Sequence, residues 1–299
     1  MKTVVAAMYA VHCPETTLDH DTSQMPYPVF KSYQHLPQDE HSGDSAAIEH
    51  HPHSEGLYAR LDCSGKLWLM EDVAQQLGRH SDKLATTEPA TVLCALTGDA
   101  SVGFEEPVRP TLCWAPALGQ NVILACSDGW TIEHWHAKRD LRHIARKATF
   151  SPYRNSNISG CINSVSCDSG GEYCMVSDEL RIFMWKLERL SHGHQPHVAL
   201  DLTPADGEEL CEVITCARFH PIDCGIIVIG FDTGRVATYD ISTTKHLGKS
   251  LREFEVAADH EGTLEQFASP VTHLAFSEDA ATLYVRDEVR VHVYTIPGQ

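Results

Sequence analysis

Residues 162–187 read INSVSCDSGGEYCMVSDELRIFMWKL, and residues 213–241 read VITCARFHPIDCGIIVIGFDTGRVATYDI. Both stretches have the same design, in which short alternating or continuous apolar runs are separated by turns rich in Gly, Asp and Ser. Short apolar runs bounded by such turn residues are typical of antiparallel β-strands. The two stretches therefore predict two copies of one β-meander.

The same design recurs on both sides of this pair. Residues 46–73 contain the hairpin pattern GLYARLDCSGKLWLM, and three short strands are expected at 110–115, 121–126 and 131–136, with a last set at 271–276, 281–285 and 289–296. An aromatic residue lies near the end of each third strand, at spacings of 50 to 67 residues: Trp68, Trp135, Trp185, Tyr239 and Tyr294. Propeller blades repeat in this way, with longer spacings where loops are inserted. The sequence predicts an all-β, WD40-like β-propeller in which five degenerate blades are recognisable.

The two ends of the chain differ in pattern. Residues 1–45 contain one candidate strand at 3–13 and are otherwise rich in Pro, His, Asp and Ser, so we expect an irregular N-terminal segment followed by a propeller over 46–299. A short surface helix is expected at 74–87, and the basic run at 138–147 is spaced like a solvated helix face. The apolar run 4–11 is too poorly flanked for a signal peptide.

The composition restricts the partners. The 41 acidic residues outnumber the 23 Lys and Arg and give a formal charge of -18, which repels nucleic acid and anionic lipid and favours a basic protein partner. Most of the 11 cysteines lie inside apolar strand patterns, where a thiol acts as a small hydrophobe. We expect a reducing compartment, the cytoplasm, with the nucleus as a second location.

Three segments carry a resemblance to a known family. They are CINSVSCDS (161–169), SDELRIFMWKLE (177–188) and EELCEVITCARFHP (208–221). With them, the chain resembles the B-family, WD40-propeller regulatory subunits of protein phosphatase 2A. The resemblance implies a seven-bladed propeller without catalytic activity that docks on a scaffold subunit and a catalytic subunit. It also implies that phosphorylated protein substrates with basic segments are recruited through an acidic groove.

The residues of that groove can be placed in this chain. The resemblance implies substrate contacts by Glu179 and by Glu208, Glu209 and Leu210. Strand order supports one shared face, because we expect Glu179 in a third-to-fourth turn and residues 208–210 before the second strand of the next blade. Asp178 is expected to add charge to the substrate-binding patch, with Glu212 nearby.

Two other functions remain open. The first is a generic propeller scaffold that no longer binds the phosphatase, since the segment 137–160 is short where the family carries a long arm. The second is a metal hydrolase that uses a histidine group at 50–53, 134–136 or 192–197, although surface histidines are more common than such sites. We find no catalytic constellation and no phosphate-cradling glycine loop, so we expect no enzyme, cofactor or metal.

Overall fold

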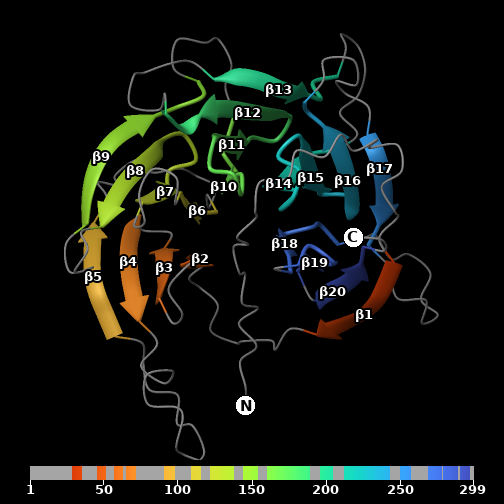
Figure 1. The fold of residues 1–299 in the computed structure, drawn as a ribbon, viewed down its shortest axis with the longest axis horizontal. Coiled ribbons are helices and arrows are strands. Elements are labelled where there is room, and N and C mark those ends of the chain that lie inside the picture. Colours follow the sequence, from red (N-terminus) through yellow and green to blue (C-terminus); the bar gives the residue numbers. More distant parts are fainter. Residues whose placement is uncertain are drawn as a thin grey trace, which may run out of the picture.

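The structure is a computed structural model, in which 20 described strands form five four-stranded antiparallel sheets. It describes residues 29–35, 46–51, 57–62, 65–71, 91–97, 109–115, 122–137, 144–153, 160–188, 196–204, 212–242, 250–256, 269–277, 279–288 and 290–296. The sheets are the blades of a five-bladed propeller, and the predicted fold class is therefore confirmed (Figure 1). Five blades are formed by the described residues, against the seven implied by the resemblance.

Each blade follows the order of the chain from its innermost to its outermost strand, apart from the last. Blade I holds β2 (Ala46–His50), β3 (Leu57–Asp62), β4 (Lys66–Glu71) and β5 (Thr91–Thr97). Blade II holds β6 (Thr111–Trp114), β7 (Val122–Cys126), β8 (Ile132–Ala137) and β9 (Ile144–Phe150). Blade III holds β10 (Ser164–Cys167), β11 (Tyr173–Ser177), β12 (Arg181–Lys186) and β13 (His197–Asp201). Blade IV holds β14 (Ile214–Phe219), β15 (Ile226–Phe231), β16 (Arg235–Asp240) and β17 (Ser250–Glu255).

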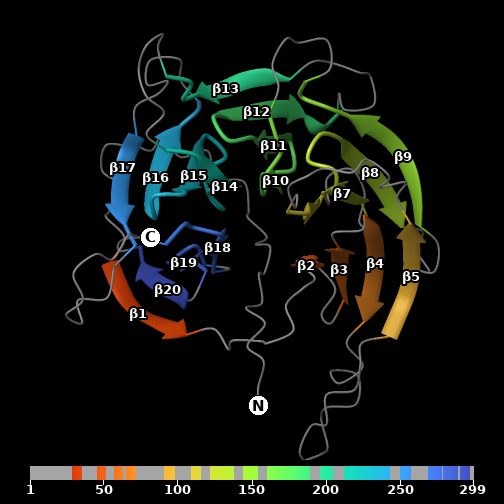
Figure 2. The same cartoon turned by 180° about the vertical axis from the view of Figure 1, so that it is seen from behind.

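Blade V combines strands from the two ends of the described chain. It holds β18 (His273–Phe276), β19 (Thr282–Arg286), β20 (Arg290–Thr295) and, on its outer edge, β1 (Val29–His35). Pairing of β1 with β20 is antiparallel and covers the outer edge of the last blade (Figure 2). The strand β1 lies within residues 1–45, which the sequence predicted to be irregular. The sequence pattern missed this strand because nothing local in it reveals a partner at the other end of the chain.

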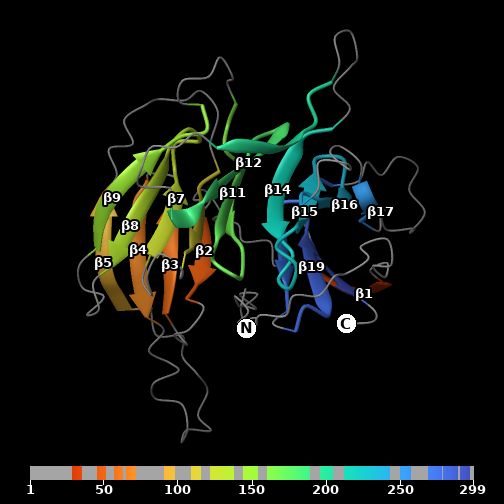
Figure 3. The same cartoon turned by 45° about the horizontal axis from the view of Figure 1, so that its top comes forward.

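From blade I to blade V, each blade contacts the next near the centre of the ring through its innermost strand (Figure 1). Figure 3 shows the blades from a tilted direction. Hydrogen bonds cross four of the interfaces between blades. They include Trp114 Nε1 to Glu49 O (3.0 Å), Val165 N to Thr111 Oγ1 (3.2 Å), Ala217 N to Ser164 Oγ (3.1 Å) and Val271 N to Phe231 O (3.0 Å). Pairing in this way satisfies polar atoms that the tight packing of the blades hides from water.

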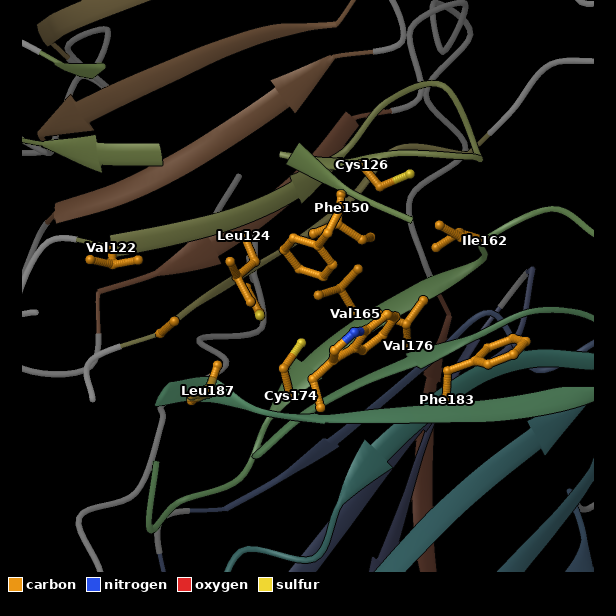
Figure 4. Close-up of a cluster of buried hydrophobic side chains, with 14 residues drawn as sticks. Val122, Leu124, Cys126, Phe150, Ile162, Val165, Cys174, Val176, Phe183 and Leu187 are labelled. Carbon is orange, nitrogen blue, oxygen red and sulfur yellow. The ribbon is translucent and has the colours of Figure 1, made fainter. Parts of the chain in front are cut away.

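Apolar side chains fill the space between the blades. Figure 4 shows the cluster between blades II and III, where Phe150 and Trp185 meet edge to face with ring centroids 5.2 Å apart. The second strands β7 and β15 are buried along their whole length, as their continuous apolar sequences predicted. The aromatic residue predicted for each third strand is also confirmed, from Trp68 on β4 to Tyr294 on β20.

The outermost strands are where sequence and structure differ. Of the basic run expected to resemble a helix face, residues 144–147 belong to the strand β9, which is fully buried only at its two ends, Ile144 and Phe150. An outer strand is covered on few positions, so its sequence is polar and lacks a clear period of 2. The candidate strand at 3–13 and the candidate helix at 74–87 lie outside the described residues. No helix in the described part of the chain is long and apolar enough to cross a membrane.

Candidate partner-binding face

The turn between β11 and β12 is organised by Asp178. Its Oδ1 accepts hydrogen bonds from the backbone amides of Leu180 (2.8 Å) and Arg181 (2.6 Å), and its Oδ2 accepts one from the Tyr153 hydroxyl (3.3 Å). The Arg181 guanidinium lies 3.5 Å from Oδ2. Asp178 is 1% exposed. Its carboxylate therefore holds the turn together and offers no surface to a partner.

The pKa of the Tyr153 hydroxyl is raised in part by this carboxylate. Burial first, and then the charge of Asp178, raise the pKa of Tyr153 far above its usual range. The hydroxyl therefore stays protonated and remains a donor. Its hydrogen bond ties the segment before β10 to the β11–β12 turn of the same blade.

The same device recurs in other blades. Asp128 Oδ1 accepts hydrogen bonds from the amides of Trp130 (2.8 Å) and Thr131 (2.7 Å), and Asp287 Oδ1 accepts one from the amide of Arg290 (2.6 Å). An Asp side chain that accepts amides two or three residues further on is a common way to stabilise a tight turn. These three turns are thus held in the same way, and the residue after Asp differs among them, whereas in blade IV Asp232 Oδ1 accepts a hydrogen bond from the amide of Val213 (2.9 Å).

Glu179 is the residue after Asp in blade III, and its side chain is exposed. Its backbone carbonyl accepts a hydrogen bond of 2.7 Å from the amide of Ile214, the first residue of β14. Leu202 N donates a second bond, of 2.8 Å, to Leu180 O. The turn that presents Glu179 is therefore fixed to both ends of the connection between blades III and IV.

That connection contains the other predicted contact residues. Glu208, Glu209 and Leu210 lie outside the described residues, and the chain is described again from Glu212. The Glu212 carboxylate accepts hydrogen bonds from Arg235 Nε (2.8 and 3.0 Å) and from Thr233 Oγ1 (3.0 Å). Its charge is therefore balanced within blade IV.

The structure corrects the strand numbering that the sequence led us to expect. The Glu179 turn joins the second and third strands of blade III, and residues 208–210 precede the first strand of blade IV. The expectation placed both positions one strand too far. In an antiparallel meander, the second-to-third turn and the connection to the next blade emerge at the same edge, so the described ends of this connection, residues 202–204 and 212–213, lie on the side of Glu179. That Glu208, Glu209 and Leu210 share this face stays a prediction.

The histidine groups do not form a metal site within the described residues. No group of three or more His, Cys, Asp or Glu that could hold a metal occurs there. His51 is buried edge to face against Trp114, with ring centroids 4.6 Å apart. His134 and His136 share strand β8, and burial followed by the charges of His136 and Lys147 lowers the pKa of His134. His53, His192 and His194 lie outside the described residues.

Buried thiols gather between blades II and III. The Sγ atoms of Cys113 and Cys167 are 3.5 Å apart, and Cys174 faces Cys167 in the register of β10 and β11. The pKa of Cys113 is raised by its hydrogen bond with Cys167 and by burial. A high pKa keeps a thiol protonated and weakly nucleophilic, so this group packs as part of the core.

Part of the chain is similar in sequence to known proteins. No family model matches the chain. The chain is 33% identical over 137 residues to the beta isoform of the 55 kDa regulatory B subunit of serine/threonine-protein phosphatase 2A from Carassius auratus, a match that covers 45% of this chain and 30% of the relative. It is 28% identical over 137 residues to the regulatory B subunit of protein phosphatase PP2A from Schizosaccharomyces pombe, covering 45% of this chain and 29% of the relative.

A third relative, the protein phosphatase PP2A 55 kDa regulatory subunit of Drosophila melanogaster, is 28% identical over 137 residues, or 45% of this chain and 27% of the relative. The matched region thus spans less than a third of the length of each of these relatives. The family resemblance seen in the sequence is confirmed. Over 45% of its length, this propeller is a homologue of the 55 kDa B regulatory subunits of protein phosphatase 2A.

Proposed function

We propose that this chain is a non-catalytic regulatory subunit of a protein phosphatase 2A complex that directs phosphorylated substrates to the catalytic subunit. The observation that carries the proposal is the homology to proteins named as regulatory subunits of this phosphatase. The five-bladed ring supports it, because radial stacking of blades builds a rigid platform whose loops serve partner binding. Its partners would be the scaffold subunit and the catalytic subunit.

Substrate recruitment would use the face that carries Glu179. The Glu179 side chain is exposed on a turn held by Asp178, and Glu208, Glu209 and Leu210 precede Glu212 in the adjoining connection. A chain with a formal charge of -18 attracts basic segments, and an exposed carboxylate on a fixed turn gives that attraction a defined position. Asp178 would act by positioning Glu179.

Affinity purification of the tagged chain from its native cells tests the proposal. Recovery of the catalytic and scaffold subunits in comparable amounts is the expected result. The alternative function, a propeller scaffold that no longer binds the phosphatase, predicts other partners and neither of these subunits. A well-folded bait that recovers neither subunit would overturn the proposal in favour of that alternative.

A further inference from the structure

Charged side chains from different blades meet at the centre of the ring. Arg218 lies on β14, the innermost strand of blade IV, and Glu49 lies on β2, the innermost strand of blade I. Their Nη2 and Oε2 atoms are 3.3 Å apart, although blades II and III lie between them in the order of the chain (Figure 2). The ion pair therefore spans the centre and brings the inner faces of two non-consecutive blades together.

Blade V adds two basic side chains to the same region. His273 begins β18 and is the register partner of Arg286, which ends β19. The strand β18 packs on β14, and just before β18 the amide of Val271 donates a 3.0 Å hydrogen bond to the carbonyl oxygen of Phe231, the last residue of β15. Both His273 and Arg286 are exposed to solvent. Together with Arg218, they place three basic groups on β14, β18 and β19 of the adjoining blades IV and V.

The electrostatic environment shows that these groups, with Arg109, act on one another. Although His273 is open to solvent, the protein atoms gathered around it lower its pKa, and the charges of Arg286, Arg218 and Arg109 lower it further, to about 4. Arg286 is also open to solvent, but the protein atoms around it and the charge of Arg109 lower its pKa. Arg109 precedes β6 in blade II and is exposed. Blades II, IV and V thus direct like charges at a common region.

The described carboxylates balance this cluster only in part. Glu49 pairs with Arg218, and its backbone carbonyl is held by Trp114 Nε1. The carboxylate of Asp287, next to Arg286, is used by the Arg290 amide at 2.6 Å and by His292 Nε2 at 2.8 Å. Among the described residues, no ion pair is formed by Arg109 or Arg286. An excess of positive charge therefore remains here in a chain whose formal charge is -18.

We propose that Arg109, Arg218, His273 and Arg286 form a binding site for a small multivalent oxyanion with the chemistry of inorganic phosphate. Guanidinium groups bind such oxyanions through paired N–H donors, and two exposed guanidiniums next to an imidazole supply donors from several directions. A bound dianion also offsets the repulsion among the three guanidinium groups, so it stabilises the assembled ring. The site uses none of the expected substrate-contact residues Glu179, Glu208, Glu209 and Leu210, and it does not depend on the proposed phosphatase role.

Calorimetric titration of the full chain with inorganic phosphate, at constant ionic strength set with chloride, tests the proposal. Saturable binding of one phosphate is expected, and Arg286→Gln and Arg109→Gln should each weaken it about tenfold. Lys147→Gln on the outermost strand β9 removes the same charge from an exposed position and is the matched control, with binding unchanged within about twofold. Equal binding by the wild type, Arg286→Gln and Arg109→Gln would overturn the proposal.

A second measurement does not rely on the variants. Titration of His273 by NMR should give a pKa that rises when phosphate is bound, because the anion offsets the field of the arginines. An unchanged His273 titration in saturating phosphate would place the anion elsewhere. A phosphoserine peptide as a further titrant distinguishes free phosphate from a phosphoryl group on a protein as the ligand. If the peptide competes with inorganic phosphate, the site also accepts a phosphoryl group on a protein. Competition by chloride at equal concentration would show general charge screening and contradict the proposal.

Discussion

The backbone amide of Ile214 donates a 2.7 Å hydrogen bond to the carbonyl oxygen of Glu179. This bond joins the second-to-third turn of blade III to the first residue of blade IV. The exposed Glu179 side chain is therefore presented by a backbone that two blades hold in place. Because the bond uses the main chain, the side chain can be changed without disturbing the junction.

Glu179→Lys should weaken substrate capture and leave assembly with the phosphatase intact. Reversal of one charge on a binding face typically slows the association of a basic partner, and we expect roughly a three- to tenfold loss of affinity. The double variant Glu208→Lys with Glu209→Lys should act in the same direction. Co-purification of the scaffold and catalytic subunits and capture of a phosphorylated substrate are measured in parallel. If capture and assembly fall together, the face serves assembly and the recruitment hypothesis is wrong.

Asp178→Ala should destabilise the propeller, in contrast to changes at its neighbour. The substitution removes the acceptor of two backbone amides and of the Tyr153 hydroxyl, and leaves Arg181 with Asp201, 3.6 Å away, in place of two carboxylate partners. Losses of this kind cost about 2 to 4 kcal/mol of unfolding free energy. Urea denaturation measures the change. Glu179→Ala is the matched control, with an expected change within about 0.5 kcal/mol.

His220 should make the propeller sensitive to acid. It is 3% exposed, and its Nδ1 accepts hydrogen bonds from the amides of Ile222 (3.3 Å) and Asp223 (3.2 Å), which requires an unprotonated Nδ1. Burial lowers the pKa of His220 to about 4, against about 6.5 in an unfolded chain. The unfolded state therefore binds more protons between these values, so stability is complete above pH 6.5 and falls as the pH drops toward 4.

The variant His220→Asn isolates this effect. An asparagine amide oxygen can accept the same backbone amides but does not titrate. The unfolding free energy of the wild type should fall by roughly 3 kcal/mol more than that of His220→Asn between pH 7 and pH 4. Denaturation midpoints at several pH values provide the comparison. If the unfolding free energies of the two proteins depend on pH in the same way, the pKa of His220 does not differ between the folded and unfolded states and the prediction is wrong.

The strands that sequence predicted best are those that are buried on both faces. The run IFMW in β12 is buried at all four positions, so its apolar character is continuous and visible. The outer strand β17, SLREFE, has no position that is fully buried, and its sequence resembles a loop. The strand β1 carries no local sign of its pairing with β20, because that contact joins distant parts of the chain. Whether β1 and β17 form strands is therefore decided by their pairing in the folded chain more than by their local β-propensity.

The candidate site shows a similar limit. The sequence indicated that Asp178 and Glu179 lie in a turn, and both were expected to face a partner. An Asp at the start of a turn competes for the backbone amides that follow it, which makes Asp178 an internal acceptor while Glu179 remains outside. The repeat of this residue at Asp128 and Asp287 was the signal that could have separated the two roles.

Gly230→Ala should push blades IV and V apart. A Cβ at Gly230 of β15 would overlap the Cγ1 of Val271, which an alanine lacks, and would lie 2.8 Å from the Cβ of Val271 and 3.0 Å from Cys216 Sγ, in the buried cluster between these blades. A methyl group without space in a packed core typically costs about 1 to 3 kcal/mol of unfolding free energy.

Val271→Ala alone should also destabilise the propeller, through lost packing. The double variant should be more stable than the sum of the two changes predicts, because the smaller residue makes room for the new methyl group. Thermal unfolding of the four proteins measures this coupling, and strict additivity would mean that Gly230 is required by the backbone of β15 and not by its contact with Val271.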